Sequence, residues 1–167
     1  MKHALPLLLL AALAACSGKD SRAAAAGESL IENFSMAESA AGASRWSLDS
    51  TLGRLDEKKG VIAFESPRIK FYDLGKVTSE ITALHGVLQM KDKSAELTDE
   101  VTVHAKRDGM QLKTTRLYYS SARGKIWTDD PVTIYKGRTV IKGRGFTANP
   151  DLSEIEIQRQ ETRLSGT

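Results

Sequence analysis

The stretch from Thr128 to Ile157 restricts the fold more than any other part of the chain, because its apolar residues alternate with polar ones. Val132 and Ile134 are separated by a single polar residue, which is the period of a strand with one buried face. The sequence at 149–151, Asn-Pro-Asp, predicts a turn, since proline fixes φ and its neighbours hydrogen-bond nearby backbone. We expect strands joined by tight turns here, and no helix.

The same pattern extends back through the chain to about Arg45. Short apolar runs recur at intervals of roughly 8 to 12 residues, which is the spacing of a sandwich or roll. Turn sequences separate these runs at 65–67, 73–75, 107–109 and 122–124. Residues 45–167 are enough for one domain with a single core. We therefore expect one all-β domain over that range.

A weak internal repeat supports this organisation. Residues 97–103, LTDEVTV, resemble residues 127–134, WTDDPVTI, with one residue inserted, and a fainter copy begins at Ser66. Repeated strand pairs that stack on one another bury a continuous interior and leave an open edge at both ends. The acidic pairs at 99–100 and 129–130 are interpreted as turn residues just ahead of a strand, not as catalytic acids and bases.

The N-terminus has the pattern of a lipoprotein export signal. Lys2 precedes an apolar run from Leu5 to Ala15, which is shorter than the about 20 residues that span a bilayer. The sequence Leu-Ala-Ala-Cys at 13–16 matches the bacterial lipobox, and Cys16 is the only cysteine. We expect residues 1–15 to be a signal peptide and Cys16 to carry the lipid. An ordinary signal peptide with a chance cysteine is the alternative.

Residues 16–44 are predicted to be the lipidated cysteine and a flexible tether, because Ala, Ser, Gly and Glu dominate the segment. A short amphipathic helix from Glu28 to Glu38 is the alternative. The export signal predicts a periplasmic, membrane-anchored lipoprotein. The periplasmic face of the inner membrane is favoured, and Ser17 leaves the outer membrane open.

The sequence contains no recognisable catalytic or metal-binding constellation. His85 and His104 lie in different expected strands, without Cys, Asp or Glu at ligand spacing. Because no nucleophile or base can be nominated, we expect neither an enzyme nor a cofactor. Four cations cluster within a short stretch, at Lys136, Arg138, Lys142 and Arg144. Such a cluster suits the phosphates of a lipid headgroup, although a solvated strand face is the default, and nucleic acid is not expected for an exported protein.

Four motifs, taken together, form a family pattern. They are Ser-Pro-x-Ile-x-Phe-Tyr at 66–72, Glu-Ile-Thr-Ala at 80–83 followed by Gly86, Leu-Thr-x-x-Val-x-Val at 97–103, and Asp-Pro-Val-x-Ile at 130–134 with Ile-x-Gly-x-Gly-Phe-x-Ala-x-Pro-Asp-Leu at 141–152. This combination resembles the LptC family, the periplasmic component of the lipopolysaccharide export machine. The resemblance covers about residues 46–157, and its C-terminal half is the most specific.

The resemblance implies a V-shaped, open β-jelly roll of two antiparallel sheets that enclose an apolar groove for acyl chains. Members of the family receive lipopolysaccharide from an inner-membrane ABC transporter. They pass it to an LptA-like periplasmic bridge protein, and the rolls join edge to edge, as unpaired strands allow. LptC proteins commonly carry a transmembrane helix, which a lipobox and tether replace here.

Alternation within the expected strands assigns one set of residues to the inner face, as lipid groove or core. They are Phe64, Ile69, Phe71, Ile81, Leu97, Val101, Val103, Leu112, Leu117, Trp127, Val132, Ile134, Val140 and Phe146. The last strand supplies the edge expected to pair with the bridge protein: Glu154, Ile155, Glu156, Ile157, Gln158 and Arg159. Two other functions remain open: an outer-membrane lipoprotein that binds another lipid or lipoprotein, and a purely structural adaptor in an envelope complex.

Overall fold

The computed structural model describes residues 27–161, which form eleven strands and, within that range, no helix. The strands are β1 (Glu28–Ala40), β2 (Ala43–Asp56), β3 (Val61–Glu65), β4 (Arg68–Asp73), β5 (Lys76–Thr82), β6 (His85–Gln89), β7 (Ser94–Ala105), β8 (Gln111–Ser120), β9 (Lys125–Lys136), β10 (Thr139–Ala148) and β11 (Ile155–Glu161). The predicted all-β, single-domain fold is confirmed. These described residues include no helix that is long and apolar enough to cross a membrane.

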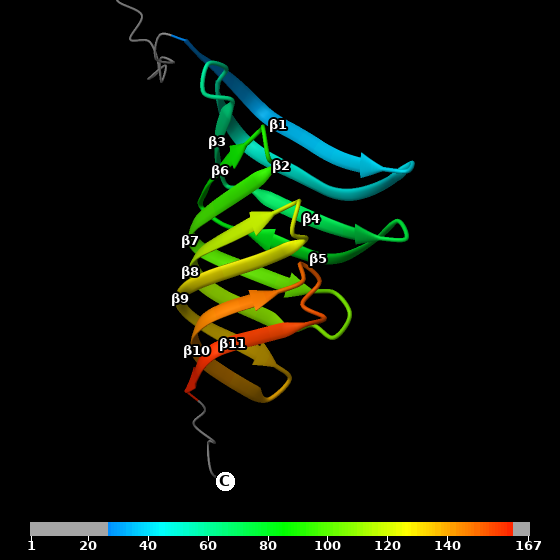
Figure 1. Ribbon diagram of the computed structural model, residues 1–167, viewed down its shortest axis with the longest axis vertical. Coiled ribbons are helices and arrows are strands. Elements are labelled where there is room, and N and C mark those ends of the chain that lie inside the picture. The colour runs from blue at the N-terminus through cyan, green and yellow to red at the C-terminus, as the bar shows by residue number, and fades with distance from the viewer. Residues whose placement is uncertain (1–26, 162–167) are drawn as a thin grey trace, which may run out of the picture.

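The strands form an antiparallel meander that is stacked along the long axis of the molecule, from β1 at one end to β11 at the other (Figure 1). β2 pairs with both β3 and β4, and β7 pairs with both β5 and β6. β3 and β4 therefore act as one long strand interrupted at its middle, and so do β5 and β6. The sheet is built of long strands, not of the short ones that the sequence predicted.

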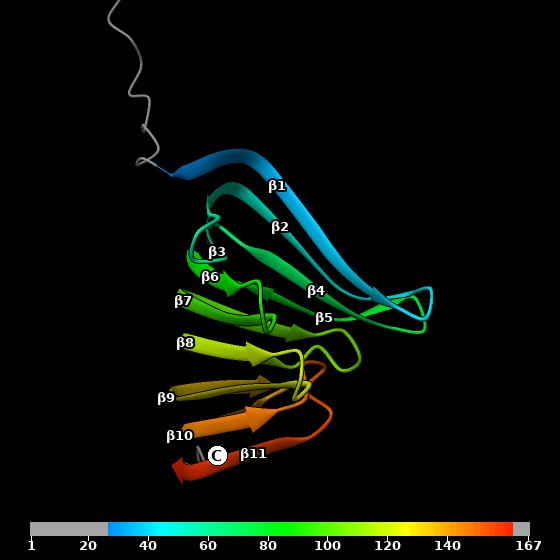
Figure 2. The same cartoon turned by 45° about the horizontal axis from the view of Figure 1, so that its top comes forward.

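A bend in each long strand divides the sheet into two layers, and Figure 2 shows this bend in β1 and β2. In β2, Leu52–Asp56 pair with β3, whereas Trp46–Asp49 pair with β4. We call the two layers the β3/β6 layer and the β4/β5 layer, after the short strands that each contains. The side of the roll opposite the bends, where the turns lie, is called the turn side. The two antiparallel sheets that the family resemblance implies are thus present as two layers, which are halves of one hydrogen-bonded sheet.

The acidic pairs lie inside long strands, at these bends. Asp99 and Glu100 have φ values of 65° and 51° and interrupt the pairing of β7 with β8. Asp129 and Asp130 lie opposite Gly145, whose φ is 76°, at the point where the register of β9 and β10 shifts. Such bulges bend a strand and re-aim the residues beyond them. The prediction that these pairs sit in turns ahead of strands was wrong, because each strand continues across its bulge.

At a bend, where backbone hydrogen bonds between the strands are interrupted, hydroxyl side chains form hydrogen bonds with the backbone groups instead. Thr128 Oγ1 accepts a hydrogen bond from the Asp130 amide at 3.1 Å. Thr114 Oγ1 donates to the Pro131 carbonyl at 3.0 Å. A buried backbone group without a partner costs free energy, so these threonines stabilise the bend.

β1 lies within the segment predicted to be a tether. Glu28–Ala40 pair with β2, and Phe34 and Met36 pack against the core. The sheet therefore begins at Glu28 and not near residue 45, and the alternative of a helix is not found either. The predicted signal peptide and Cys16 lie outside the residues that the structure describes.

The predicted turn between β10 and β11 is confirmed. The Leu152 amide donates to the Asn149 carbonyl at 2.9 Å, and Asp151 Oδ1 accepts a hydrogen bond from the Ser153 amide at 3.0 Å. This turn directs Leu152 into the core, where it is only 1% exposed. The turn thus closes part of the space between the layers at the β11 end.

Candidate functional site

The inner faces of the two layers form one apolar surface. All but two of the residues predicted to face inward are buried, and none of these is more than 6% exposed. They are Phe64, Ile69, Phe71, Ile81, Leu97, Val101, Val103, Leu112, Leu117, Val132, Ile134 and Phe146. Because successive side chains in a strand point to opposite faces, the apolar positions of both layers meet in the interior.

Trp127 faces outward, so its predicted inward orientation was wrong. Its ring stacks on Tyr118 with a centroid distance of 5.6 Å, and the Arg123 guanidinium lies 5.5 Å from its centroid. Ile126 and Thr128 take the inner positions, at 0% and 1% exposure. Since neighbours in a strand face opposite sides, Trp127 lies on the outer face.

Val140 is also on the outer face and is 42% exposed, which contradicts the prediction. Ile141 packs against the core in its place. The register of β10 shifts between Arg144 and Phe146, at the bulge of Gly145. Positions counted back from Phe146 therefore change face when they pass the bulge.

The interior near β2 and β3 holds almost no free space. Its cavity measures only about 10 Å³ and is lined by Trp46, Leu48, Phe64, Ile69, Leu88, Ala95 and Tyr119. Phe71 and Tyr119, from different layers, meet edge to face with ring centroids 5.1 Å apart. A single water needs about this much space, so no acyl chain fits there while the layers are in contact.

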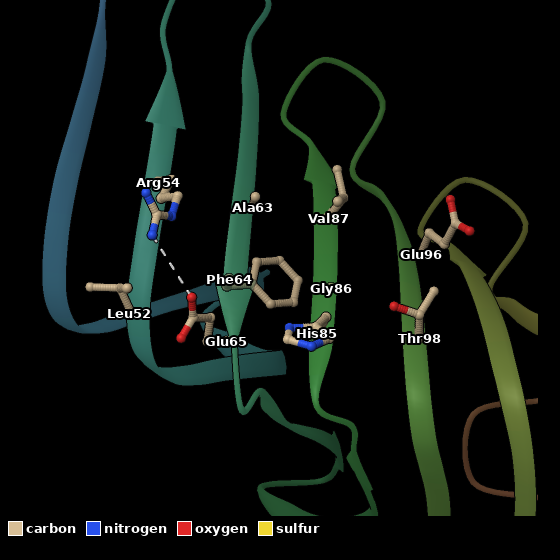
Figure 3. A pocket seen from close by; sticks show the side chains of 10 residues that line it. All are labelled: Leu52, Arg54, Ala63, Phe64, Glu65, His85, Gly86, Val87, Glu96 and Thr98. Carbon is tan, nitrogen blue, oxygen red and sulfur yellow. Dashed lines mark ion pairs between the residues drawn. The ribbon is translucent and has the colours of Figure 1, made fainter. Parts of the chain in front are cut away.

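Gly86 permits this packing. The ring of Phe64 points toward Gly86 (Figure 3), and a Cβ at that position would collide with the ring and lie 2.8 Å from Leu97 Cδ2. Glycine is thus required here because a side chain from the neighbouring strand occupies its place.

The outer face of the β3/β6 layer has a hollow of about 340 Å³ (Figure 3). Arg54 and Glu65 form an ion pair across it at 3.9 Å, and Glu96 at its rim pairs with Arg116 at 3.3 Å. His85 lies on this exposed rim. Residues 27–161 contain no group of His, Cys, Asp or Glu that could hold a metal ion.

Glu38 connects the two layers on the turn side, near β1. Its carboxylate accepts a hydrogen bond from Trp46 Nε1 at 2.8 Å within its own layer. In the other layer it lies 3.4 Å from Lys93 Nζ and accepts a hydrogen bond from Ser121 Oγ at 3.3 Å. Burial acts to raise the pKa of Glu38, but the bonds from Trp46 and Lys93 outweigh it and hold the pKa below the ordinary value of 4.5. The ionised carboxylate is therefore part of the closed arrangement.

The interior opens at the β11 end. A space of about 340 Å³ lies between the layers there, and we call it the β11 mouth. Its lining residues are Arg107, Met110, Ile134, Lys136, Ile141, Leu152, Ser153, Ile155, Ile157 and Gln160. Met110, Ile134 and Leu152 form a buried apolar base, whereas Ile155 is 37% exposed. This end of the inner surface is thus apolar and accessible.

Comparison with protein families decides where the chain belongs. The family described as "Lipopolysaccharide-assembly, LptC-related" matches residues 5–163. This chain belongs to the LptC-related family. Its fold is similar to the crystal structure of LptH from Pseudomonas aeruginosa, described as the LptA homologous periplasmic component of the lipopolysaccharide transport device. The TM-score is 0.56 at 11% sequence identity, over 68% of this chain and 82% of that one. No curated protein sequence matches.

The LptC-related sheet has a free edge at each end. Among the described residues, β11 pairs only with β10, and β1 pairs only with β2. The edge predicted at 154–159 is β11, which begins at Ile155 and continues to Glu161. Glu154 lies in the bend before it, with its carboxylate 3.1 Å from Lys125 Nζ.

Sequence reasoning missed several residues of the site in this LptC-related chain. Glu38 was assigned to the tether, although Phe34, Met36 and Glu38 are spaced two apart, as the inner positions of a strand are. Met110 lies at the mouth between the layers, a position that the sequence did not indicate. Nothing in the local pattern pairs it with the turn before β11, since only the folded sheet brings the two together.

Proposed function

We propose that this LptC-related chain is a periplasmic transport protein that binds lipopolysaccharide. It receives the lipid from an inner-membrane ABC transporter and passes it to an LptA-like bridge protein, toward the outer membrane. The observation that carries the proposal is the single apolar inner surface, which runs between two free sheet edges. Acyl chains on that surface are removed from water, and a second roll docked at either edge extends the surface.

Passage of lipid past β2 and β3 requires the two layers to separate, because the cavity there measures only about 10 Å³. Separation breaks the contacts of Glu38 with Lys93 and Ser121 and the contact between Phe71 and Tyr119. The β11 mouth accepts lipid without such a movement. We therefore expect the buried inner residues to serve as core when the roll is empty and as groove when it is loaded.

Photo-crosslinking tests lipid binding by the inner surface. An aromatic crosslinker such as benzoylphenylalanine replaces Phe71 or Phe146, which are inward, and Thr133, which faces outward, is the control. We expect capture of lipopolysaccharide from the two inward positions in cells that express the full chain. Capture from Thr133 alone would reject the assignment of the inner face.

The edge strand β11 is proposed to pair with the bridge protein, and β1 with the transporter side. Strand addition uses main-chain hydrogen bonds, and a proline removes a donor and fixes φ. Ile157→Pro should therefore abolish co-purification with the bridge protein while the rest of the sheet stays folded. Unchanged co-purification, with circular dichroism matching that of the parent protein, would argue against this edge.

Attachment to the membrane is proposed to occur through lipidated Cys16, at the periplasmic face of the inner membrane. Acylation at more than one position holds a protein stably at a membrane. Cys16→Ala should release the protein into the soluble periplasmic fraction. Recovery of the parent protein with the outer membrane would favour the alternative of a lipoprotein that binds a different lipid or lipoprotein.

A purely structural adaptor is the second candidate function, and the tightly packed interior at the β1 end favours it. Such an adaptor joins two rolls through β1 and β11 without contacting lipid. It predicts co-purification with both partners and no capture of lipopolysaccharide from Phe71 or Phe146. The crosslinking experiment therefore separates the two functions.

A further inference from the structure

Two cations line the β11 mouth beside its apolar residues. Arg107 and Lys136 are both exposed, and both pair with Asp108, Arg107 Nη2 at 3.8 Å and Lys136 Nζ at 3.4 Å. Asp108 is itself fixed, because its Oδ1 accepts a hydrogen bond from the Met110 amide at 3.2 Å. One carboxylate thus holds two cations at the rim, and the mouth keeps an excess of positive charge.

The cations remain available to a ligand. The side chains of Arg107 and Lys136 are 59% and 58% exposed, and ion pairs with that exposure contribute little to stability. An arginine fork and a lysine ammonium are the groups that bind phosphate in proteins. A phosphate at the rim can therefore replace Asp108 as the partner of these two cations.

The apolar part of the mouth suits an apolar group of the ligand, not its phosphate. Met110, Ile134 and Leu152 are buried at its base, and Ile155 is exposed at its rim. Its volume of about 340 Å³ lies within the range of small-molecule sites, roughly 300 to 1,000 Å³. A ligand that fills the mouth needs an apolar chain and an anionic group close together.

We propose that the β11 mouth binds the phosphorylated, acylated end of lipopolysaccharide, with phosphate on Arg107 and Lys136 and an acyl chain over the apolar base. This inference rests on the proposed function and assigns a place to the headgroup that it leaves open. Ile155 and Ile157 belong both to the mouth and to the edge strand β11. The bound headgroup therefore lies beside the edge to which the next roll is proposed to dock, which makes the mouth the exit site for the lipid.

The test compares two double variants of the full-length protein that remove the same charge. R107A/K136A alters the mouth, and K58A/K91A removes two exposed lysines from turns of the β3/β6 layer. Fluorescently labelled lipopolysaccharide and the same lipid stripped of its lipid A phosphates are titrated into each protein. We expect R107A/K136A to bind the phosphorylated lipid about tenfold more weakly than the parent protein, since hydrogen bonds to charged groups are lost. K58A/K91A should bind it like the parent protein.

The dephosphorylated lipid separates a phosphate contact from a structural effect. It should bind the parent protein and R107A/K136A equally. Equal weakening of both lipids by R107A/K136A would overturn the proposal, and so would a comparable loss in K58A/K91A, which would indicate general charge attraction. Unchanged binding by R107A/K136A, with capture from Phe146 intact, would overturn the mouth site and leave the proposed function standing. If neither Phe71 nor Phe146 captured lipopolysaccharide in a protein with Arg107 and Lys136 intact, both the mouth site and the proposed function would be rejected.

Discussion

The two ends of the interior share an apolar inner face but differ in how far that face is closed. At the β1 end, side chains surround a cavity of about 10 Å³, and Glu38 ties the layers together. At the β11 end, about 340 Å³ remains open, and Ile155 is 37% exposed. An apolar inner face therefore does not by itself make a groove. Free space depends on how closely the side chains of the two layers pack against each other.

The largest expected difference between the ends concerns packing. Phe64 is 2% exposed beside Gly86, so Phe64→Ala should lower the free energy of unfolding by about 3–5 kcal/mol. Ile141 is only partly buried at the mouth, so Ile141→Ala should cost about 1 kcal/mol. Urea denaturation of both variants measures the two losses. Equal losses would show that the two ends of the interior do not differ in packing.

The docking of β11 depends on Gly143. A Cβ there would meet Ile157 Cγ2 at 2.5 Å and the Arg159 carbonyl oxygen at 2.7 Å. Gly143→Ala should therefore cost about 1–3 kcal/mol and speed hydrogen exchange in β11, while β1 stays protected. Lys142→Ala, at the exposed neighbour, should change the free energy of unfolding by less than about 0.5 kcal/mol. If β1 and β11 exchanged equally fast in Gly143→Ala, the effect of Gly143 would not be confined to the β11 end.

The closure of the β1 end depends on Glu38. Glu38→Ala leaves the buried indole N–H of Trp46 without its acceptor, so a loss of about 1–3 kcal/mol is expected. Glu32→Ala, at an exposed position of the same strand, is the matched control and should have almost no effect. Chemical denaturation of both variants provides the measurement. Equal effects would mean that Glu38 does not hold the layers together.

The same carboxylate predicts a dependence on pH. Its pKa is lowered in the folded state, so its ionised form stabilises the fold. That contribution is fully present above the unfolded value of 4.5 and is lost as the pH falls through the folded pKa. The difference in stability between the parent protein and Glu38→Ala should therefore shrink from about pH 6 to about pH 3. A constant difference would assign the effect to packing instead.

The smallest expected effect is at Ser79, on the inner face of β5. Its hydroxyl is buried and has no hydrogen-bond partner within residues 27–161. Ser79→Ala should leave the free energy of unfolding unchanged or raise it by up to about 1 kcal/mol, because an unsatisfied polar group is removed. A clear loss of stability would mean that the hydroxyl makes a bond in solution.

Sequence alternation predicted the inner face well wherever a strand ran without a bulge. The errors came at bends. The internal repeat matched Trp127 to Leu97, but the inserted residue lies at the bend, so Thr128 takes the place that Leu97 has in β7. Thr128 can be buried because its hydroxyl forms a hydrogen bond with the backbone, and a polar residue is not recognised as inward-facing from hydrophobic alternation. At Val140, the bulge of Gly145 reversed the phase, which alternation alone does not reveal.

The contacts between the layers could not be predicted from the sequence. Glu38 meets Lys93 and Ser121 only because the sheet folds back on itself. β1 was missed because most of its side chains are polar or small, and only Phe34 and Met36 pack against the core. The free edge of the last strand was predicted, since its position follows from chain order in a meander.

The most direct test of lipid passage through the interior is a distance across the turn side, measured between spin labels. Ser39→Cys with Arg123→Cys reports on the β1 end, and Arg138→Cys with Ser153→Cys reports on the β11 end. When lipopolysaccharide is added to the full-length protein, we predict that the first distance lengthens and the second stays the same. A first distance that does not change while lipopolysaccharide is captured from Phe71 would contradict the account, because lipid would then lie at the β1 end without parting the layers there.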